Sequence, residues 1–433
     1  MTNASERHLG LSRRDFLILA GSAAAAAAVG ASPALAQSAP LKFWDMPWGA
    51  PAYNAGVKDL LASYAPAAGL PGATYQTIQW SNFFQTFASA LASNTGPALS
   101  TGGAFQAFQF AQQGEIAYAD NVIDGFKKSG IYDDFLPGTI DALKTPDGYV
   151  GVPWQIDMRI IWYRKSLLEK AGVQPPTDWK SWLEVGKSLK KIGIFGFAAG
   201  AGANNNLGNQ AMISLMINNG GGLFDDNGKP DALNPRNIEA MDFVRELANE
   251  GIIDPASVAY SSDNLNNMWT SGKGAIGYNT PGLDQDLGDT SGEYAVMDPP
   301  TGPHGDKGSL YFVNNIMMYK NNPSQPGTEA LVTWYVQNMH TLWQKGLVPQ
   351  LPVLKSIVAS KEFQANAAYA KIIKEWQPVS KPQSARSPYS FAAMASIDGA
   401  QMLFDLTQTM LPGKTDSKDA LQALQTNLES VMS

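Results

Sequence analysis

The chain has 433 residues, a length typical of two domains, and 44% of its residues are hydrophobic, which is ample for two cores. It contains no cysteine, which excludes disulfides and thiolate metal sites and argues against a lipid-modified N-terminal cysteine. A formal net charge of -7 disfavours nucleic acid and anionic lipid surfaces as partners.

The first 36 residues are predicted to be an export signal and not part of the fold. Arg13 and Arg14 form the centre of a twin-arginine motif, an alanine-rich apolar run follows, and Ala34-Leu35-Ala36 matches an Ala-x-Ala cleavage site. The alternative is a membrane anchor, but the run is too short and too rich in alanine to span a bilayer. We therefore expect export to the periplasm by the twin-arginine pathway, without a lipid anchor.

Short apolar strands and amphipathic helices alternate after the signal. Ser81 is expected to cap a helix whose apolar face carries several phenylalanines. The alternation predicts a parallel-rich α/β sheet. The expected elements are strands at 41–44 and 75–79, and helices at 53–65, 81–93 and 105–113.

The middle of the chain carries the clearest local signals. Asp147-Gly148 is a tight-turn pair, and the apolar and aromatic run from Met158 to Tyr163 predicts one buried strand. Gly172 is expected to close a short helix in the C-cap position, and Thr177 or Asp178 is expected to cap the next helix.

The second half continues the same alternation and then becomes mainly helical. The expected elements are strands at 194–199 and 311–319, helices at 179–191, 207–218, 236–249 and 328–344, and a late loop at 377–388.

The order of these elements and several short motifs resemble the carbohydrate-binding solute-binding proteins of bacterial ABC importers. Ala98 departs from the family pattern, which has an aspartate there, and Arg164 replaces the usual asparagine. The resemblance covers essentially the whole chain after the signal. The motifs that carry it are Gly151-Val152-Pro153, Trp162-Tyr163, Ala171-Gly172-Val173, Leu223-Phe224-Asp225, Gly272-Lys273-Gly274-Ala275, Pro299-Pro300-Thr301-Gly302-Pro303 and Gly346-Leu347-Val348-Pro349.

The resemblance implies an α/β fold of the two-lobed periplasmic-binding-protein type (type II-like), with discontinuous lobes joined by a hinge. The N-terminal lobe is expected to take residues 37–156 and 298–345, and the C-terminal lobe residues 157–297 and 346–433. It also implies a monomer that hands a carbohydrate to the membrane permease of an ABC importer. No cofactor is expected, and no metal, because His304 and His340 stand in no metal-binding pattern.

In open α/β sheets, ligands bind outside the carboxyl ends of the strands. The loops at those ends, with the crossovers between lobes, therefore supply the candidate ligand-binding residues. Flat aromatic faces suit the C–H side of a sugar ring, and Asp, Asn, Gln and Arg suit its hydroxyls. The candidates are Asp45, Trp48, Gln79, Ser81, Gln85, Gly103, Trp154, Asp157, Asn205, Gly221, Asn279, Gly282, Tyr311, Asn314 and Arg386.

Several of these candidates have a purely structural alternative. Asp157 is the preferred polar candidate, and its alternative is a salt bridge with Arg159. Trp48 and Trp154 are left open between cleft and core, and Arg386 is left open between ligand and solvent. Four tryptophans on strand or helix faces are expected in the core, as is Trp44 inside the first strand; the four are Trp162, Trp179, Trp269 and Trp334.

Three functions remain to be compared. The first is a binding protein for a carbohydrate, with a neutral disaccharide or glycosyl-polyol as the default and an anionic sugar left open by Arg386. The second is a secreted glycoside hydrolase or lyase, for which Asp45 and Asp157 would have to face each other about 5–10 Å apart. The third is a binding protein for another solute, although no cluster of acids, Tyr or His suggests a polyamine or iron.

Overall fold

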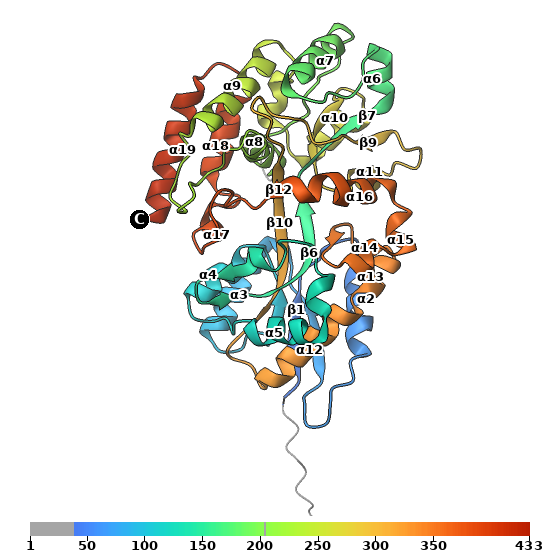
Figure 1. Ribbon diagram of the computed structural model, residues 1–433, viewed down its shortest axis with the longest axis vertical. Helices are drawn as coiled ribbons and strands as arrows, with labels where there is room; N and C mark the ends of the chain where they lie inside the picture. Colours follow the sequence, from blue (N-terminus) through green and yellow to red (C-terminus); the bar gives the residue numbers. More distant parts are fainter. Residues whose placement is uncertain (1–38, 203–204) are drawn as a thin grey trace, which may run out of the picture.

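The computed structural model describes residues 39–202 and 205–433, so the expected export signal lies outside the described residues. The chain forms two α/β lobes, one above the other, that meet at a narrow waist (Figure 1). This is the two-lobed architecture that the sequence predicts. In the part of the chain described, no helix is both long and apolar enough to cross a membrane.

The larger sheet runs through the lower lobe and into the waist. Its strand order is β11-β6-β10-β3-β1-β2, with β12 beside β10. Parallel pairing is confined to β2-β1-β3 and to β10-β12, whereas β10 is antiparallel to both β3 and β6. The expected parallel-rich sheet is therefore mixed. The strands are β1 (Leu41–Asp45), β2 (Ala73–Thr77), β3 (Leu99–Thr101), β6 (Val152–Met158), β10 (Ser309–Met318), β11 (Leu351–Pro352) and β12 (Ser380–Lys381).

The upper lobe contains a smaller antiparallel sheet with the order β8-β7-β9. The expected single strand from Met158 to Tyr163 is wrong in one respect, because the chain breaks at Arg159 and changes sheets there. Ile194–Ala199 makes only isolated bridges and not a regular strand. The strands are β7 (Ile160–Arg164), β8 (Ile276–Asn279) and β9 (Tyr294–Val296), and a separate hairpin consists of β4 (Lys144–Thr145) and β5 (Gly148–Tyr149).

Helices surround both sheets. Those of the lower lobe are α2 (Pro51–Ala62), α3 (Phe83–Ala92), α4 (Gln106–Gln112), α5 (Asp120–Ser129), α12 (Gln325–Asn338) and α13 (His340–Gln344). The middle of the chain adds α6 (Lys165–Ala171), α7 (Trp179–Lys191), α8 (Leu207–Asn218), α9 (Pro235–Asn249), α10 (Ser262–Thr270) and α11 (Leu283–Asp286). The last third adds α14 (Lys355–Val358), α15 (Lys361–Gln364), α16 (Ala367–Lys371), α17 (Met394–Ile397), α18 (Gln401–Met410) and α19 (Ser417–Met432). The short 3-10 turns are η1 (Trp80–Asn82), η2 (Ile131–Asp134), η3 (Asp141–Leu143), η4 (Pro255–Ala259) and η6 (Gln377–Val379), and η5 (Ile372–Trp376) is a π-helical turn.

Local chemistry explains where these helices begin and end. Asp178 caps α7 in a capping box with Ser181, and Gly172 closes α6 with a φ of 65°, as the sequence predicts. Ser81 is not a cap, because it lies inside η1 and makes no capping hydrogen bond. The expected helix at 328–344 begins earlier and is interrupted at Met339.

The tryptophans expected in the core are buried, except for one that is only partly so. Trp44, Trp162, Trp179 and Trp269 belong to the core, whereas Trp334 packs against its edge.

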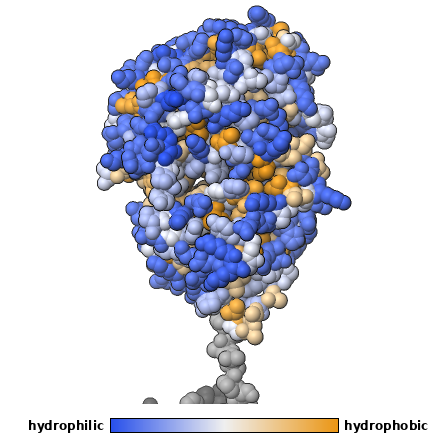
Figure 2. All heavy atoms as spheres, viewed as in Figure 1, coloured by the Kyte–Doolittle hydropathy of each residue, from blue (hydrophilic) through white to orange (hydrophobic). Residues whose placement is uncertain are grey.

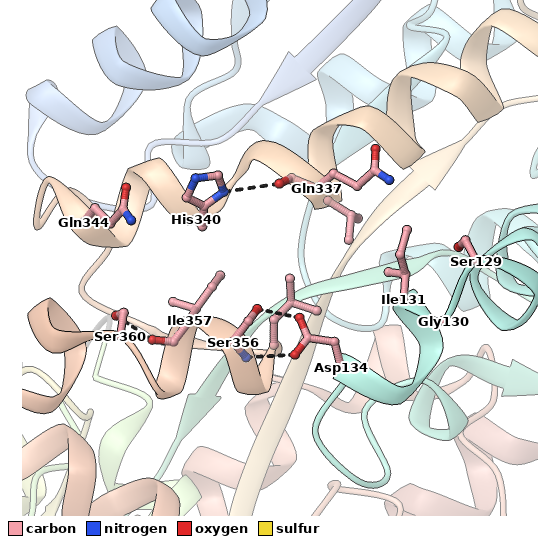
Figure 3. Close-up of a pocket in the computed structure, with 12 residues that line it drawn as sticks. Ser129, Gly130, Ile131, Asp134, Gln337, His340, Gln344, Ser356, Ile357 and Ser360 are labelled. Carbon is pink, nitrogen blue, oxygen red and sulfur yellow. Dashed lines mark hydrogen bonds between the residues drawn. The ribbon is translucent and has the colours of Figure 1, made fainter.

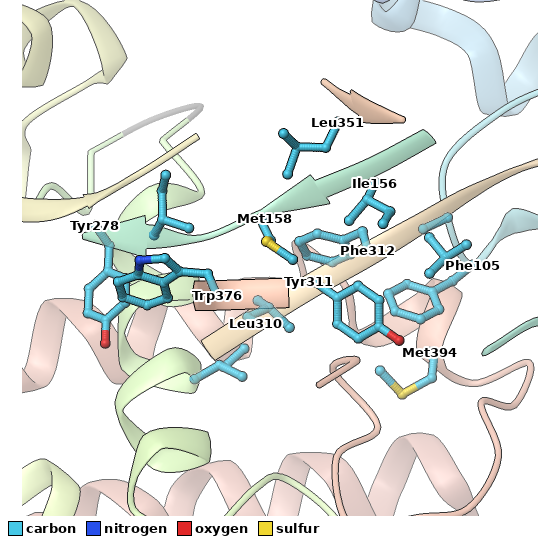
Figure 4. Packing of buried hydrophobic residues seen from close by; sticks show 14 of the residues in the cluster. Phe105, Ile156, Met158, Tyr278, Leu310, Tyr311, Phe312, Leu351, Trp376 and Met394 are labelled. Atoms are coloured by element: carbon cyan, nitrogen blue, oxygen red, sulfur yellow. The ribbon is translucent and has the colours of Figure 1, made fainter. Parts of the chain in front are cut away.

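The waist is itself a packed core. Phe312 of β10 packs against Phe105 with ring centroids 6.0 Å apart, and Met394 lies beside them (Figure 4). On the other side, the Trp376 indole donates a hydrogen bond of 2.8 Å to the Met297 carbonyl. Side chains from both lobes therefore hold β6 and β10, which form the antiparallel ribbon at the waist.

The predicted boundaries between the lobes, at residues 156/157, 297/298 and 345/346, stay a prediction. The contacts favour later positions for the second and third boundaries. Leu354 bridges to Phe135, and Ser356 donates to Asp134, so this segment packs on the lower lobe. Thr301 donates its backbone N–H to the Thr177 carbonyl of the upper lobe. These contacts favour a crossing within β10 and a return after α14.

Candidate functional site

A pocket of about 490 Å³ opens between the two lobes beside β6. The loop after β1, the loop after β8 with α11, and the segment before β11 contribute its walls. Hydrophobic atoms are visible in Figure 2 at the level where the lobes meet. The lining residues are Pro47, Trp48, Gly49, Ala50, Ala52, Tyr53, Asp157, Thr280, Pro281, Gly282, Gln285, Asp286, Gly346, Leu347, Pro349 and Gln350.

A second cavity of about 510 Å³ lies on the outer side of the lower lobe, between η2, α12, α13 and α14 (Figure 3). Its walls carry Ile131, His340 and Ile357, but no Trp, Tyr or Phe. It therefore offers no aromatic face for a sugar ring. The interlobe pocket combines aromatic, amide, hydroxyl and carboxylate groups, and it is the better candidate site.

Trp48 is the aromatic face of the interlobe pocket. Its indole N–H donates a hydrogen bond of 3.1 Å to the Thr101 hydroxyl at the end of β3. Its ring lies edge-on to Trp154, with centroids 5.7 Å apart, and to Trp80, with centroids 4.9 Å apart. Trp154 is fully buried, so it supports Trp48 from below and does not itself line the pocket. Three contacts therefore fix the orientation of one half-buried indole.

Asp45 lies beneath this loop and is fully buried. Its carboxylate accepts hydrogen bonds from the Thr101 hydroxyl at 2.5 Å, the Tyr75 hydroxyl at 3.0 Å and the Met46 backbone N–H at 2.9 Å. Because Thr101 also accepts the Trp48 N–H, a relay connects Asp45 to the pocket wall. Asp45 is therefore turned away from the cleft, and it does not face Asp157 as the pair considered for a hydrolase would require.

Burial raises the pKa of Asp45 to about 6, although hydrogen bonds from Thr101 and Tyr75 oppose the rise. The folded state therefore holds the proton more tightly than the unfolded state, in which the pKa is near 3.8. The free energy of unfolding should fall as pH rises from about 4 to about 6, and Asp45→Asn should abolish about 2–3 kcal/mol of that fall.

Guanidinium unfolding at several pH values between 4 and 7.5 measures this difference between wild type and Asp45→Asn. The slope of the unfolding free energy against pH is compared between the two proteins. Hydrogen bonds that the substitution changes by the same amount at every pH do not affect this slope. Asp226→Asn is the matched control, because it makes the same change of side chain at a residue that is 79% exposed. Parallel curves for Asp45→Asn and wild type would contradict the assignment.

Asp157 lies at the floor of the pocket, at the end of β6. Its side chain is 23% exposed, and it accepts a hydrogen bond of 2.8 Å from Arg159. Arg159 also donates to Gln210 and stacks on the Phe312 ring, 5.3 Å from the ring centroid. The salt bridge that the sequence left as the alternative is therefore present. It does not remove Asp157 from the pocket, because the second carboxylate oxygen has no protein partner among the described residues.

Asp398 faces the same arginine from the loop between α17 and α18. Burial raises the pKa of Asp398 to about 6, the Arg159 charge lowers it, and the Asp157 charge raises it. The side chain as a whole is exposed to solvent. Two carboxylates and one guanidinium therefore meet where the lobes join.

The upper wall is formed by the loop after β8 and by α11. Gly282 lines the pocket, and Asn279 lies just behind it, where its amide oxygen accepts the Thr280 backbone N–H at 2.8 Å. The Asn279 amide nitrogen is buried and has no hydrogen-bond partner within the described residues. Gly49 permits the lower wall to approach, since a Cβ there would lie 2.9 Å from the Leu347 carbonyl.

Four predicted residues lie at or near the outer rim of the lower lobe. Gln79, Ser81 and Gln85 are exposed on η1 and α3, and Gly103 faces open space in the loop before α4. None of the four lines the pocket.

Three further candidates, Asn205, Gly221 and Arg386, contact other parts of the protein and do not line the pocket. Asn205 is buried and donates to the Tyr260 carbonyl, and a Cβ on Gly221 would clash with Asn237. Arg386 pairs with Asp231 at 2.5 Å, so it binds protein and not solvent.

Tyr311 and Asn314 are nearly buried on β10, and burial raises the pKa of Tyr311 to about 12. The structure therefore brings Trp48, Asp157 and Gly282 together in one pocket, with Asn279 behind them.

Several pocket residues were not among the predicted ones. Thr280 and Pro281 lie in the loop 279–282, which the sequence did nominate, but only its two end residues, Asn279 and Gly282, were chosen as candidates. The segment from Gly346 to Gln350 was interpreted only as a family motif. Only the position of Thr280 directly after a strand was a usable signal.

Comparisons with known proteins agree with this architecture. The family described as bacterial extracellular solute-binding protein matches residues 73–340. The crystal structure of a sugar transporter from Arthrobacter chlorophenolicus A6, with bound laminaribiose, is 53% identical and has a TM-score of 0.82. The alignment covers 91% of this chain and 100% of that one.

Two curated relatives are more distant. A binding protein of Brucella abortus (strain 2308) is 23% identical over 59% of this chain, and the chain spans 62% of that relative's length. The ABC transporter periplasmic-binding protein YcjN of Escherichia coli is 24% identical over 69% of this chain and 71% of its own length. With a family match over more than half of its residues, the chain belongs to the bacterial extracellular solute-binding proteins.

Proposed function

We propose that this protein captures a small neutral carbohydrate in the interlobe pocket and delivers it to the permease of an ABC importer. The observation that carries the proposal is the pocket itself, in which a fixed indole faces carboxylate, amide and hydroxyl groups from the opposite lobe. The aromatic face suits the C–H side of a sugar ring, and the polar groups suit its hydroxyls. The 53%-identical structure with bound laminaribiose supports a disaccharide.

The charges around the pocket favour a neutral ligand over an anionic one. Asp157 and Asp286 line it, and Arg159, the arginine beside Asp157, is already paired. Arg386, which had left an anionic sugar open, is engaged by Asp231. A uronate would therefore meet net negative charge without a free guanidinium.

Titration calorimetry with laminaribiose and other neutral disaccharides tests the proposal, together with chromatography of each sugar after prolonged incubation. We expect binding without turnover, a lower radius of gyration with ligand from closure of the hinge, and no binding of glucuronate. Release of monosaccharide would overturn it in favour of an enzyme. A thermal response to amino acids or polyamines, with none to sugars, would overturn it in favour of another solute.

Delivery to a permease implies export, a periplasmic location and action as a monomer, which we include in the proposal. Light scattering of the purified protein at micromolar concentration tests the oligomeric state. Fusion of residues 1–36 to a reporter, in cells with and without the twin-arginine translocase, tests the export route.

Asp157→Asn is expected to weaken disaccharide binding about tenfold, because a charged acceptor of sugar hydroxyls becomes a neutral one. Asp226→Asn is the matched control, since Asp226 is 79% exposed in a distant hairpin and also pairs with an arginine. Calorimetry of both variants makes the comparison. Affinities of Asp157→Asn within about twofold of wild type would remove Asp157 from the binding residues.

A further inference from the structure

The rim beside the pocket exposes large aromatic side chains where a helix normally presents polar ones. Trp80 in η1 is 37% exposed and Phe84 in α3 is 49% exposed. A surface helix usually turns its polar residues toward water, and contiguous exposed apolar patches mark binding surfaces. Ser81 and Gln85, next to them in the chain, are exposed as well.

These aromatics are continuous with the wall of the pocket. The Trp80 ring lies edge-on to Trp48, with centroids 4.9 Å apart, and 5.2 Å from the ring of Phe83. Phe83 in turn lies 4.1 Å from Phe84. The Trp80 indole N–H donates 3.1 Å to the carbonyl of Pro47, which lines the pocket. A row of rings, Trp48, Trp80, Phe83 and Phe84, thus leads from the pocket out to solvent. The hydrogen bond to Pro47 fixes the Trp80 ring in this row.

The stretch of chain that carries this row is uncharged. No Asp, Glu, Lys, Arg or His occurs in the chain between Asp59 and Glu115, the stretch that forms β2, η1, α3, β3 and α4. The polar groups near the exposed rings are amides and hydroxyls, including those of Gln79, Ser81 and Gln85. A protein surface or an anionic ligand would normally be met by complementary charge. Rings flanked by neutral hydrogen-bonding groups suit a neutral chain of sugars.

We infer that the pocket continues onto an aromatic track, formed by Trp80, Phe83 and Phe84, that binds further units of a neutral oligosaccharide. The inference rests on the proposed function. It extends that function from a disaccharide held in the pocket to a longer saccharide whose end leaves the cleft over α3 (Figure 1). Each exposed ring would cover one sugar face, with Gln79, Ser81 and Gln85 accepting or donating at its hydroxyls.

Calorimetry with β-1,3-linked gluco-oligosaccharides of two, three and four units tests the track. We expect wild type to bind the tetrasaccharide about tenfold more tightly than the disaccharide. Phe84→Ala should lose about threefold or more of the tetrasaccharide affinity and keep the disaccharide affinity within about twofold. Phe84 is 49% exposed, so Phe84→Ala should leave the fold intact. Trp80→Phe supplies a second variant, which retains a ring.

Tyr389→Ala is the matched control, because Tyr389 is 45% exposed in a loop of the last third of the chain and belongs to no such row. It should leave every affinity unchanged. Equal affinities of wild type for all three lengths, or equal losses for all lengths in Phe84→Ala, would overturn the track while leaving the proposed function intact. Absence of binding to the whole series would overturn both, and a dimer that Phe84→Ala dissociates would make the patch an interface between copies.

Discussion

Trp48→Ala is expected to weaken disaccharide binding by about 30-fold or more, which corresponds to about 2 kcal/mol of binding free energy. The substitution removes the aromatic face of the pocket and exposes Trp80 and Trp154 behind it. Calorimetry measures the loss. Trp48→Phe should retain part of the affinity, since it keeps a flat ring but loses the hydrogen bond to Thr101.

Thr101→Val separates the ring from its positioning. It is nearly isosteric, yet it removes the hydroxyl that accepts the Trp48 N–H and donates to Asp45. Thr101→Ser is its matched control, because it keeps the hydroxyl. A loss of affinity in Thr101→Val that Thr101→Ser does not show would support the relay, whereas wild-type affinity in Trp48→Ala would remove Trp48 from the site altogether.

Trp154→Ala is expected to lower the free energy of unfolding by about 3–5 kcal/mol, the usual cost of deleting a buried tryptophan. Its ring is fully buried between Tyr53, at a centroid distance of 6.2 Å, and Trp343, also at 6.2 Å. Guanidinium unfolding followed by fluorescence measures the change.

Trp334→Ala is the control for a tryptophan of the same lobe that is only partly buried and touches Tyr64. It should cost about 1–2 kcal/mol. If Trp154→Ala cost no more than this, Trp154 would not be the support beneath the pocket wall.

Elements with local causes could be predicted from the sequence. The Asp178 cap and the Gly172 terminator depend on residues within one turn of the helix end, and both are present. The helix Leu207–Asn218 was predicted with both of its ends correct. By contrast, the break at Arg159 depends on a partner in α8, Gln210, which no local pattern reveals.

The site was predicted less completely because its geometry is decided by distant partners. A polar residue at the end of a strand or directly after it points to a cleft, and Asp157 and Thr280 follow that rule. Asp45 follows it equally well in sequence, yet hydroxyls from β2 and β3 fold over its carboxylate and bury it. Asp398 comes near Arg159 from a loop that no strand precedes, so only the tertiary structure brings the two together.

The position of β10 has a consequence for biosynthesis. This strand lies between β6 and β3 in the larger sheet, although it follows β6 by about 150 residues in the chain. The first lobe therefore lacks the middle of its sheet until Met318 has left the ribosome, and nascent chains that end earlier should be sensitive to protease. Because the sheet is completed late, chaperones have a long time in which to bind the unfinished polypeptide before it folds.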